Sequence, residues 1–130
     1  MKQKTAKRLL DALLAAEEIN AFVAGETEHS YLQDRKLQLA LLHLLTILGE
    51  SLSQARRDEP SVGQLLPEAR QIIGMRNRIV HVYDGVDLRL LWQAMTLRVP
   101  ELVPRLEEVL GAVEIDEDEE ATGVRPARRW

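Results

Sequence analysis

Residues 76 to 83 read Arg-Asn-Arg-Ile-Val-His-Val-Tyr, and this stretch is the most informative part of the chain. It places a permanent cation (Arg76), a carboxamide (Asn77), a group that titrates near neutral pH (His81) and a phenol (Tyr83) close together. A histidine can move the proton of a ribose 2′-hydroxyl or of a leaving oxygen. An arginine can stabilise the negative charge that develops on phosphorus oxygens. These side chains are therefore suited to cleaving RNA without a metal ion.

Arg76, four intervening residues, His81, one residue and Tyr83 resemble the Arg-x4-His-x-Tyr signature of HepT-like ribonuclease toxins, within the HEPN superfamily. Short motifs have many false positives, so the surrounding residues matter. The resemblance runs from residue 5 to residue 113 and includes Ile72-Ile73-Gly74-Met75, Leu48-Gly49-Glu50, Asp87 and Trp92. It implies a HEPN-like helical fold that forms a dimer.

Apolar residues recur at helical spacing through most of the chain, which predicts an all-α fold. Gly25 is expected at the C-cap of the first helix, because glycine readily adopts the left-handed conformation in which helices often end. Asp87 is typical of an N-cap. Pro67 and Pro100 are typical of a first helical turn. The pattern predicts an antiparallel bundle of about five helices, over residues 5–23, 31–55, 67–84, 87–97 and 100–113.

The 130 residues are enough for one domain. We expect the helical domain to span residues 1–113 and residues 114–130 to form a flexible charged tail. The chain has a formal net charge of −4, but the tail holds six acids and three arginines, so 15 acids and 14 bases remain in the domain. A domain with this balance will not bind RNA promiscuously, and a small, shaped site must supply the affinity.

The chain has no cysteine, which excludes disulfides, thiolate catalysis and cysteine-based zinc sites and agrees with a cytoplasmic location. The first residues enter an amphipathic pattern directly, so we expect no signal peptide. The most apolar run, residues 37–48, is shorter than the about 20 residues that span a bilayer, so we expect no membrane segment. The three histidines are scattered, and we expect no metal site and no cofactor; His43 is expected in the core or at an interface.

The spacing of the signature limits its geometry. Residues five apart on an α-helix are separated by about 140° around the axis, so Arg76 and His81 cannot share a face of a regular helix. Either the helix loosens near His81, or the site combines residues from two chains. The family resemblance implies the second solution, with one composite cleft in a homodimer. One His81 would then act as base and the other as acid, while the two Arg76 side chains stabilise the phosphorane.

The remaining signature residues have separate expected roles. Asn77 either orients Arg76 or the phosphate, or bonds to local backbone, and Arg78 faces solvent as an RNA-binding candidate. Glu50 matches an acid of the family and is expected to pair with Arg76. The resemblance further implies that an MNT-type nucleotidyltransferase antitoxin is the partner and that it adenylylates Tyr83, which would block RNA by bulk and charge.

Two functional readings remain open from the sequence. The first is a metal-independent endoribonuclease toxin of a HEPN/MNT (type VII) toxin–antitoxin system with RNA as substrate. The alternative is a non-catalytic HEPN-type module that binds substrate or nucleic acid for a nucleotidyltransferase. The presence of Arg76, His81 and Tyr83 together favours the enzyme, because an adaptor has no physical need for all three.

Overall fold

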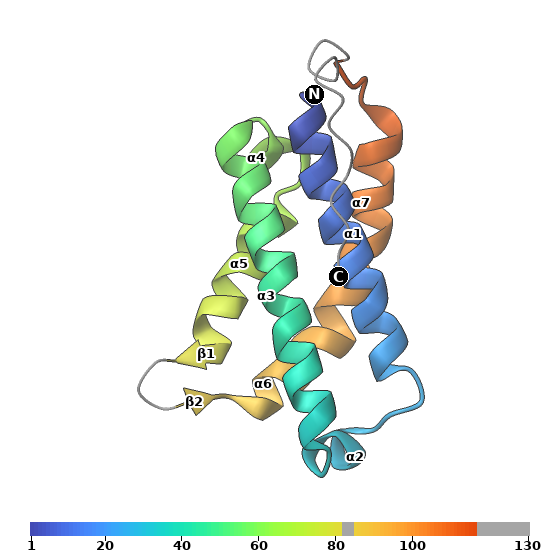
Figure 1. Ribbon diagram of the computed structural model, residues 1–130, viewed down its shortest axis with the longest axis vertical. Helices are drawn as coiled ribbons and strands as arrows, with labels where there is room; N and C mark the ends of the chain where they lie inside the picture. Colours follow the sequence, from blue (N-terminus) through green and yellow to red (C-terminus); the bar gives the residue numbers. More distant parts are fainter. Residues whose placement is uncertain (82–84, 117–130) are drawn as a thin grey trace.

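The computed structural model describes residues 1–81 and 85–116, without the His81 side chain. Long helices run up and down the molecule in an antiparallel bundle, so the predicted all-α class is confirmed (Figure 1). The elements are α1 (Gln3–Val23), α2 (Glu28–Leu32), α3 (Arg35–Asp58), α4 (Val62–Leu65), α5 (Glu68–Ile79), β1 (Val80–His81), β2 (Gly85–Val86), α6 (Leu88–Gln93), the π-helix η1 (Ala94–Arg98) and α7 (Val99–Ala112).

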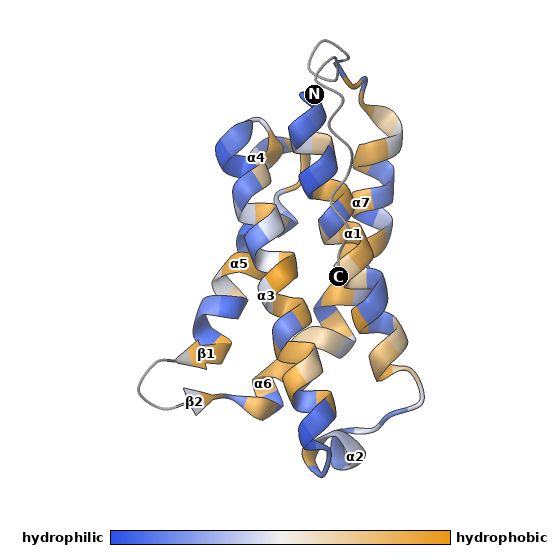
Figure 2. Ribbon diagram, viewed as in Figure 1, coloured by the Kyte–Doolittle hydropathy of each residue, from blue (hydrophilic) through white to orange (hydrophobic). Residues whose placement is uncertain are grey.

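The core lies where α1 packs against α3 and α7, and where α3 packs against α5. Ala12, Ala15 and Ala16 on α1 are fully buried, and their small side chains let the neighbouring helices approach closely. Buried leucines of α3, among them Leu45 and Leu48, fill the space between the helices. Figure 2 shows hydrophilic residues gathered at the end of α3 and at the start of α1, at one end of the bundle.

Two short polar motifs divide what we predicted as one helix over residues 31–55. Thr27 and Ser30 form a reciprocal capping box that starts α2. The Asp34 side chain then accepts the Leu37 backbone N–H at 3.1 Å and starts α3. The single-helix prediction was wrong because an aspartate that caps a new helix was read as a surface residue of a continuous one. The predicted role of Gly25 is confirmed, since it follows α1 with a φ of 79°.

The helical segments α6, η1 and α7 follow one another without a gap, so the predicted break between residues 97 and 100 was wrong. Pro100 has no N–H and its ring crowds the carbonyl of Thr96, which makes a regular α-helix unfavourable there. The chain widens into a π-helix over Ala94–Arg98 instead of ending the helix. The N-cap role of Asp87 is confirmed, because its side chain accepts the Leu90 N–H at 3.1 Å.

Both ends of the described bundle are tied together near the amino terminus. The Met1 ammonium donates to the Glu114 carbonyl oxygen at 2.8 Å, and the Asp116 N–H donates to the Met1 carbonyl oxygen at 2.8 Å. The Lys2 N–H donates to Glu59 Oε1 at 2.9 Å, just beyond the end of α3. The segment after α7 is therefore joined to α1 as far as residue 116; the expected flexibility of residues 117–130 concerns residues outside those described.

Candidate active site

Arg76 lies in the last turn of α5, where its side chain packs directly on α3. A Cβ atom built on Gly49 would be 3.6 Å from Arg76 Cγ and 3.8 Å from Arg76 Cβ. Gly49 is buried, and the aliphatic stem of Arg76 lies across it, at a distance where an added Cβ atom would make an ordinary van der Waals contact. The stem of Arg76 therefore packs on α3 on one side.

The expected ion pair between Glu50 and Arg76 is not formed among the described residues. Glu50 Oε1 instead lies 3.7 Å from Nη2 of Arg57, with both side chains exposed. Arg57 is seven residues further along α3, which brings it back to within about 20° of Glu50 around the helix axis. The long arginine side chain therefore reaches Glu50 along the same helix, and the pair contributes little stability because it is exposed.

Asn77 lies beside Arg76 at the surface. Nη1 of Arg76 donates to Asn77 Oδ1 at 3.5 Å, which is the outer limit for a hydrogen bond. Such a long, exposed contact constrains the guanidinium weakly, so orientation of Arg76 by Asn77 stays a prediction.

The backbone around His81 differs from the predicted continuous helix. Helix α5 ends at Ile79, and β1 pairs with β2 in an antiparallel hairpin that aligns Val80 with Val86 and His81 with Gly85. β-Branched residues favour extended backbone, and Gly85 adopts a φ of 86° that other residues rarely tolerate. The prediction that the helix continues to residue 84 was wrong, because these local preferences outweigh the helical pattern.

The hairpin removes the constraint that a regular helix placed on Arg76 and His81. The helix does end before His81, which is the first of the two solutions considered from the sequence. A composite site between two chains stays a prediction, since no second chain is described. The predictions for the His81 side chain and for Tyr83 also concern groups outside the described residues.

Tyr31 is buried and holds the backbone just after the hairpin. The sequence did not indicate this role. The Tyr31 hydroxyl donates to the Leu88 carbonyl oxygen at 2.6 Å, directly after β2 and Asp87, and its ring stacks on Trp92 with centroids 4.9 Å apart. Burial, and secondarily the charge of Asp87, raise the pKa of Tyr31 to about 12. The phenol of Tyr31 is therefore neutral at physiological pH and can donate its hydrogen bond to the Leu88 carbonyl oxygen.

Arg78 is exposed, as expected, on the side of α5 turned away from Arg76. It lines an open groove together with Arg98 of η1, a residue that the sequence did not single out. In the described residues, 1–81 and 85–116, no group of three or more His, Asp or Glu side chains is arranged to hold a metal ion. No helix in these ranges combines the length and apolarity needed to cross a membrane.

Comparison with known proteins assigns the chain to a family. The family model of the HepT-like ribonucleases matches residues 12–109, most of the chain and the whole of the Arg76–His81 region. The chain belongs to the ribonuclease HepT-like family. The match includes α3 and α5, so the Gly49–Arg76 contact and the hairpin lie within the part of the chain that the family defines.

Relatives of this family agree with the assignment over most of their length. A probable ribonuclease HepT from Thermococcus cleftensis is 30% identical over 109 residues, which cover 84% of this chain and 98% of the relative. A putative RNase from Caldanaerobacter subterraneus subsp. tengcongensis is 28% identical over 88 residues, covering 68% of this chain and 78% of the relative. A putative RNase from Methanocaldococcus jannaschii is 26% identical over 111 residues, covering 85% and 90%. No solved structure matches the chain.

Proposed function

We propose that this chain is a metal-independent endoribonuclease and the toxin of a HEPN/MNT toxin–antitoxin system, acting in the cytoplasm as a homodimer. The observation that carries the proposal is that the Arg76–His81 signature occurs in a chain that belongs to the HepT-like ribonuclease family. Arg76 projects from the last turn of α5 over Gly49, and His81 follows two residues after that helix ends. Within the described residues no carboxylate forms an ion pair with Arg76, so its charge is available to a phosphate.

In the proposed reaction, one His81 removes the proton of a ribose 2′-hydroxyl, and the 2′-oxygen attacks the adjacent phosphorus in line. The bond from phosphorus to the 5′-oxygen breaks, and the second His81 of the dimer gives that oxygen a proton. The two Arg76 guanidinium groups stabilise the negative charge of the phosphorane. The products are a 2′,3′-cyclic phosphate and a free 5′-hydroxyl.

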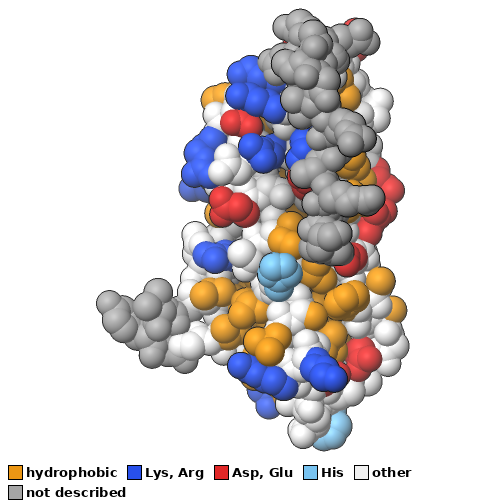
Figure 3. Space-filling model, in the orientation of Figure 1, with side chains coloured by type: hydrophobic (Ala, Val, Ile, Leu, Met, Phe, Trp, Pro, Cys, Tyr) orange, Lys and Arg blue, Asp and Glu red, His pale blue; other side chains and the backbone are white. Residues whose placement is uncertain are grey.

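Exposed apolar side chains on α1 and α3 support the dimer. Leu14, Phe22 and Leu39 are 37%, 41% and 49% exposed, which is unusual for large apolar residues gathered on two packed helices. Figure 3 shows apolar side chains gathered on the face that carries α1 and α3, with charged side chains above and below them. His43 is exposed one turn of α3 from Leu39, so its expected place in the core was wrong and an interface role stays open.

We further propose that an MNT-type nucleotidyltransferase antitoxin neutralises the enzyme by adenylylating Tyr83. The hydroxyl of Tyr83 lies two residues after His81 in the sequence, so a nucleotide attached there adds negative charge beside the site that must bind RNA phosphate. Intact mass before and after incubation with such an antitoxin and ATP measures the modification, and Tyr83→Phe is its control.

The experiment that tests the proposed function is cleavage of a structured RNA pool in EDTA by the purified full chain, with intact mass recorded. His29→Ala is the matched control for His81→Ala, since His29 is exposed on α2 and outside the signature. Cleavage by the wild type and His29→Ala but not by His81→Ala, with cyclic phosphate ends, is the expected result. Cleavage that EDTA abolishes contradicts the mechanism. An unmodified dimer that does not cleave favours the non-catalytic binding partner instead.

A further inference from the structure

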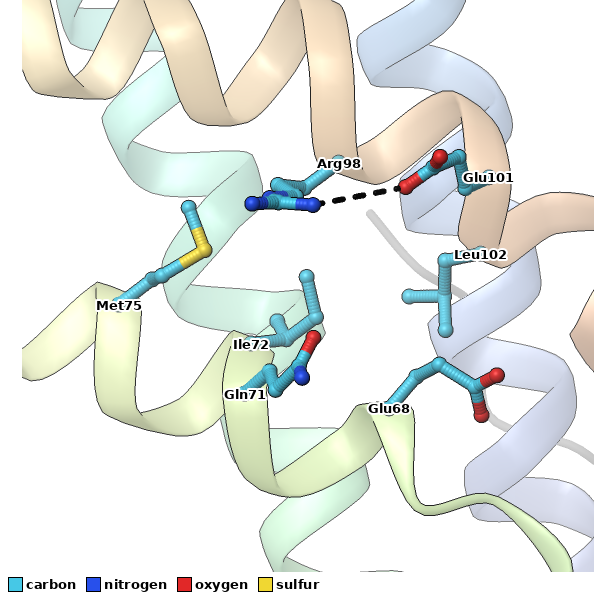
Figure 4. A pocket seen from close by; sticks show the side chains of 7 residues that line it. All are labelled: Glu68, Gln71, Ile72, Met75, Arg98, Glu101 and Leu102. Carbon is cyan, nitrogen blue, oxygen red and sulfur yellow. Dashed lines mark ion pairs between the residues drawn. The ribbon is translucent and has the colours of Figure 1, made fainter.

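A groove separate from the Arg76 site lies between α5 and the junction of η1 with α7. It has a volume of about 350 Å³ and is lined by Gln71, Gly74, Met75, Arg78 and Arg98. A smaller hollow continues it and shares three of these residues, with Arg98 facing α5 across the space (Figure 4). The volume is in the range of sites that hold small ligands or single units of a polymer.

One stripe of α5 forms one wall of this groove. Gln71, Gly74, Met75 and Arg78 are spaced three, four and seven residues from the first, so they share one side of the helix. Arg76 is about 200° from Arg78 around the axis. Helix α5 therefore turns one arginine towards α3 and the other into the groove, and the two sites meet at its carboxyl end.

Gly74 leaves the backbone of α5 uncovered within this wall. A Cβ atom added to Gly74 meets no heavy atom within 4 Å, so packing inside the chain does not require glycine there. Glycine is among the least favourable residues in a helix interior. A ligand that approaches the helix backbone closely gives the position a physical reason that folding does not.

The opposite wall carries Arg98, the last residue of the π-helix. π-Helical turns occur frequently at functional sites. Arg98 makes one long ion pair, 3.9 Å from Nη1 to Glu101 Oε1, and its side chain remains 58% exposed. Because most of its side chain is exposed, the guanidinium can contact an anion in addition to Glu101, and Arg78 is exposed as well.

We propose that this groove binds a single-stranded segment of the RNA substrate, with Arg78 and Arg98 contacting backbone phosphates from opposite walls. The inference rests on the proposed function. A strand that leaves the Arg76–His81 site crosses the carboxyl end of α5 and enters the groove, where the open backbone at Gly74 and the apolar side chain of Met75 receive a base. The groove thus supplies the local affinity that the near-neutral domain lacks.

The test measures binding separately from cleavage. The probe is a fluorescein-labelled single-stranded RNA in which every ribose is 2′-O-methylated, so that no 2′-hydroxyl is free to attack. Its affinity for the full chain is measured by anisotropy at several salt concentrations. Arg78→Gln and Arg98→Gln should each weaken binding about tenfold and reduce the slope of log affinity against log salt by about 0.7. Lys36→Gln, an equal charge change at an exposed position of α3, should leave both unchanged.

A glycine pair separates a binding effect from a folding effect. Gly74→Leu should weaken binding of the same probe while thermal unfolding stays at or above the wild-type temperature, since leucine favours helix. Gly111→Leu is the control, because Gly111 is also helical with nothing within 4 Å of an added Cβ atom and lies outside the groove. Equal binding by the two glycine variants contradicts a ligand at the α5 backbone.

Failure of the groove and failure of the proposed function give different results. Wild-type affinity in both arginine variants overturns the groove, and the nuclease still stands if the wild type cleaves RNA in EDTA and His81→Ala does not. If both arginine variants bind the probe more weakly but the wild-type chain does not cleave RNA, the nuclease proposal is overturned and the proposal of RNA binding in the groove stands. A poly-glutamate peptide that competes as strongly as RNA overturns the RNA assignment in favour of an acidic protein segment.

Discussion

Replacing Gly49 tests how α3 positions Arg76 without altering any residue of the signature. Gly49 is buried in the middle of α3, and an added Cβ atom would make an ordinary contact of 3.6 Å with Arg76 Cγ. Alanine is favoured over glycine in a helix interior by about 1 kcal/mol. Gly49→Ala should therefore raise the unfolding temperature by about 3 °C and retain cleavage.

Gly49→Val should separate stability from activity. Valine branches at Cβ, so its two γ-methyl groups extend into the space that the Arg76 stem occupies. Arg76 is only partly buried and can swing outwards, so the cost in stability should stay within about 1 kcal/mol, at the lower end for overpacking. If the Arg76 guanidinium moves by about 1 Å, it no longer stabilises the transition state well, and cleavage should slow about 100-fold.

The assays are thermal unfolding and single-turnover cleavage of RNA in EDTA. Gly111→Ala and Gly111→Val give the effect of each side chain on a helix where no neighbour lies within 4 Å of the added Cβ atom. A Gly49→Val variant that cleaves at the wild-type rate refutes the claim that this contact positions Arg76. Destabilisation by Gly49→Ala would refute the packing geometry itself.

Three further predictions concern the framework around the site. Tyr31→Phe should lower the free energy of unfolding in urea at pH 7 by about 1 kcal/mol, because the Leu88 carbonyl loses its hydrogen-bond donor. The contribution of Tyr31 to wild-type stability should be complete below pH about 10 and should decline as the pH rises towards 12, and the variant should lack this decline. The hydrogen bond from the Lys2 N–H holds the pKa of Glu59 below its ordinary 4.5, so the stability that Glu59 contributes is present above that pH and is lost in more acidic solution. Glu59→Gln should flatten the acid side of the plot of unfolding free energy against pH, and an unchanged plot speaks against this hydrogen bond. Leu48→Ala, in the fully buried core, should cost about 2–5 kcal/mol in the same unfolding assay, and a smaller loss would mean that the core collapses around the cavity.

The sequence predicts the helical framework well because that framework depends on local pattern. Buried alanines and leucines recur at helical spacing along α1 and α3, and Gly25 and Asp87 occupy the cap positions that their conformational preferences indicate. The break before α3 was missed because Asp34 looks the same as a surface aspartate until its side chain is seen to accept the Leu37 N–H.

Other features depended on competing preferences that a sequence pattern does not resolve. A run of apolar residues such as Ile79 and Val80 fits both a helix and a strand, and its pairing with Val86 decides between them only in three dimensions. The π-helix depends on how the helix accommodates Pro100, and the pairing of Glu50 with Arg57 depends on the conformations of two exposed side chains. The candidate residues of the signature were identifiable from the sequence. The contact between Gly49 and Arg76 and the surroundings of Tyr31 and Arg98 became visible only in three dimensions.

The most direct test of a composite site is a subunit-mixing experiment. Wild-type chain and His81→Ala are unfolded together in equal amounts, refolded and assayed for RNA cleavage in EDTA at fixed total protein. If each cleft needs a histidine from both subunits, random pairing leaves about one quarter of the dimers active. A rate near one quarter of that of the wild type is the predicted result. A rate near one half means that each chain cleaves RNA with its own histidine, and would contradict the two-histidine cleft.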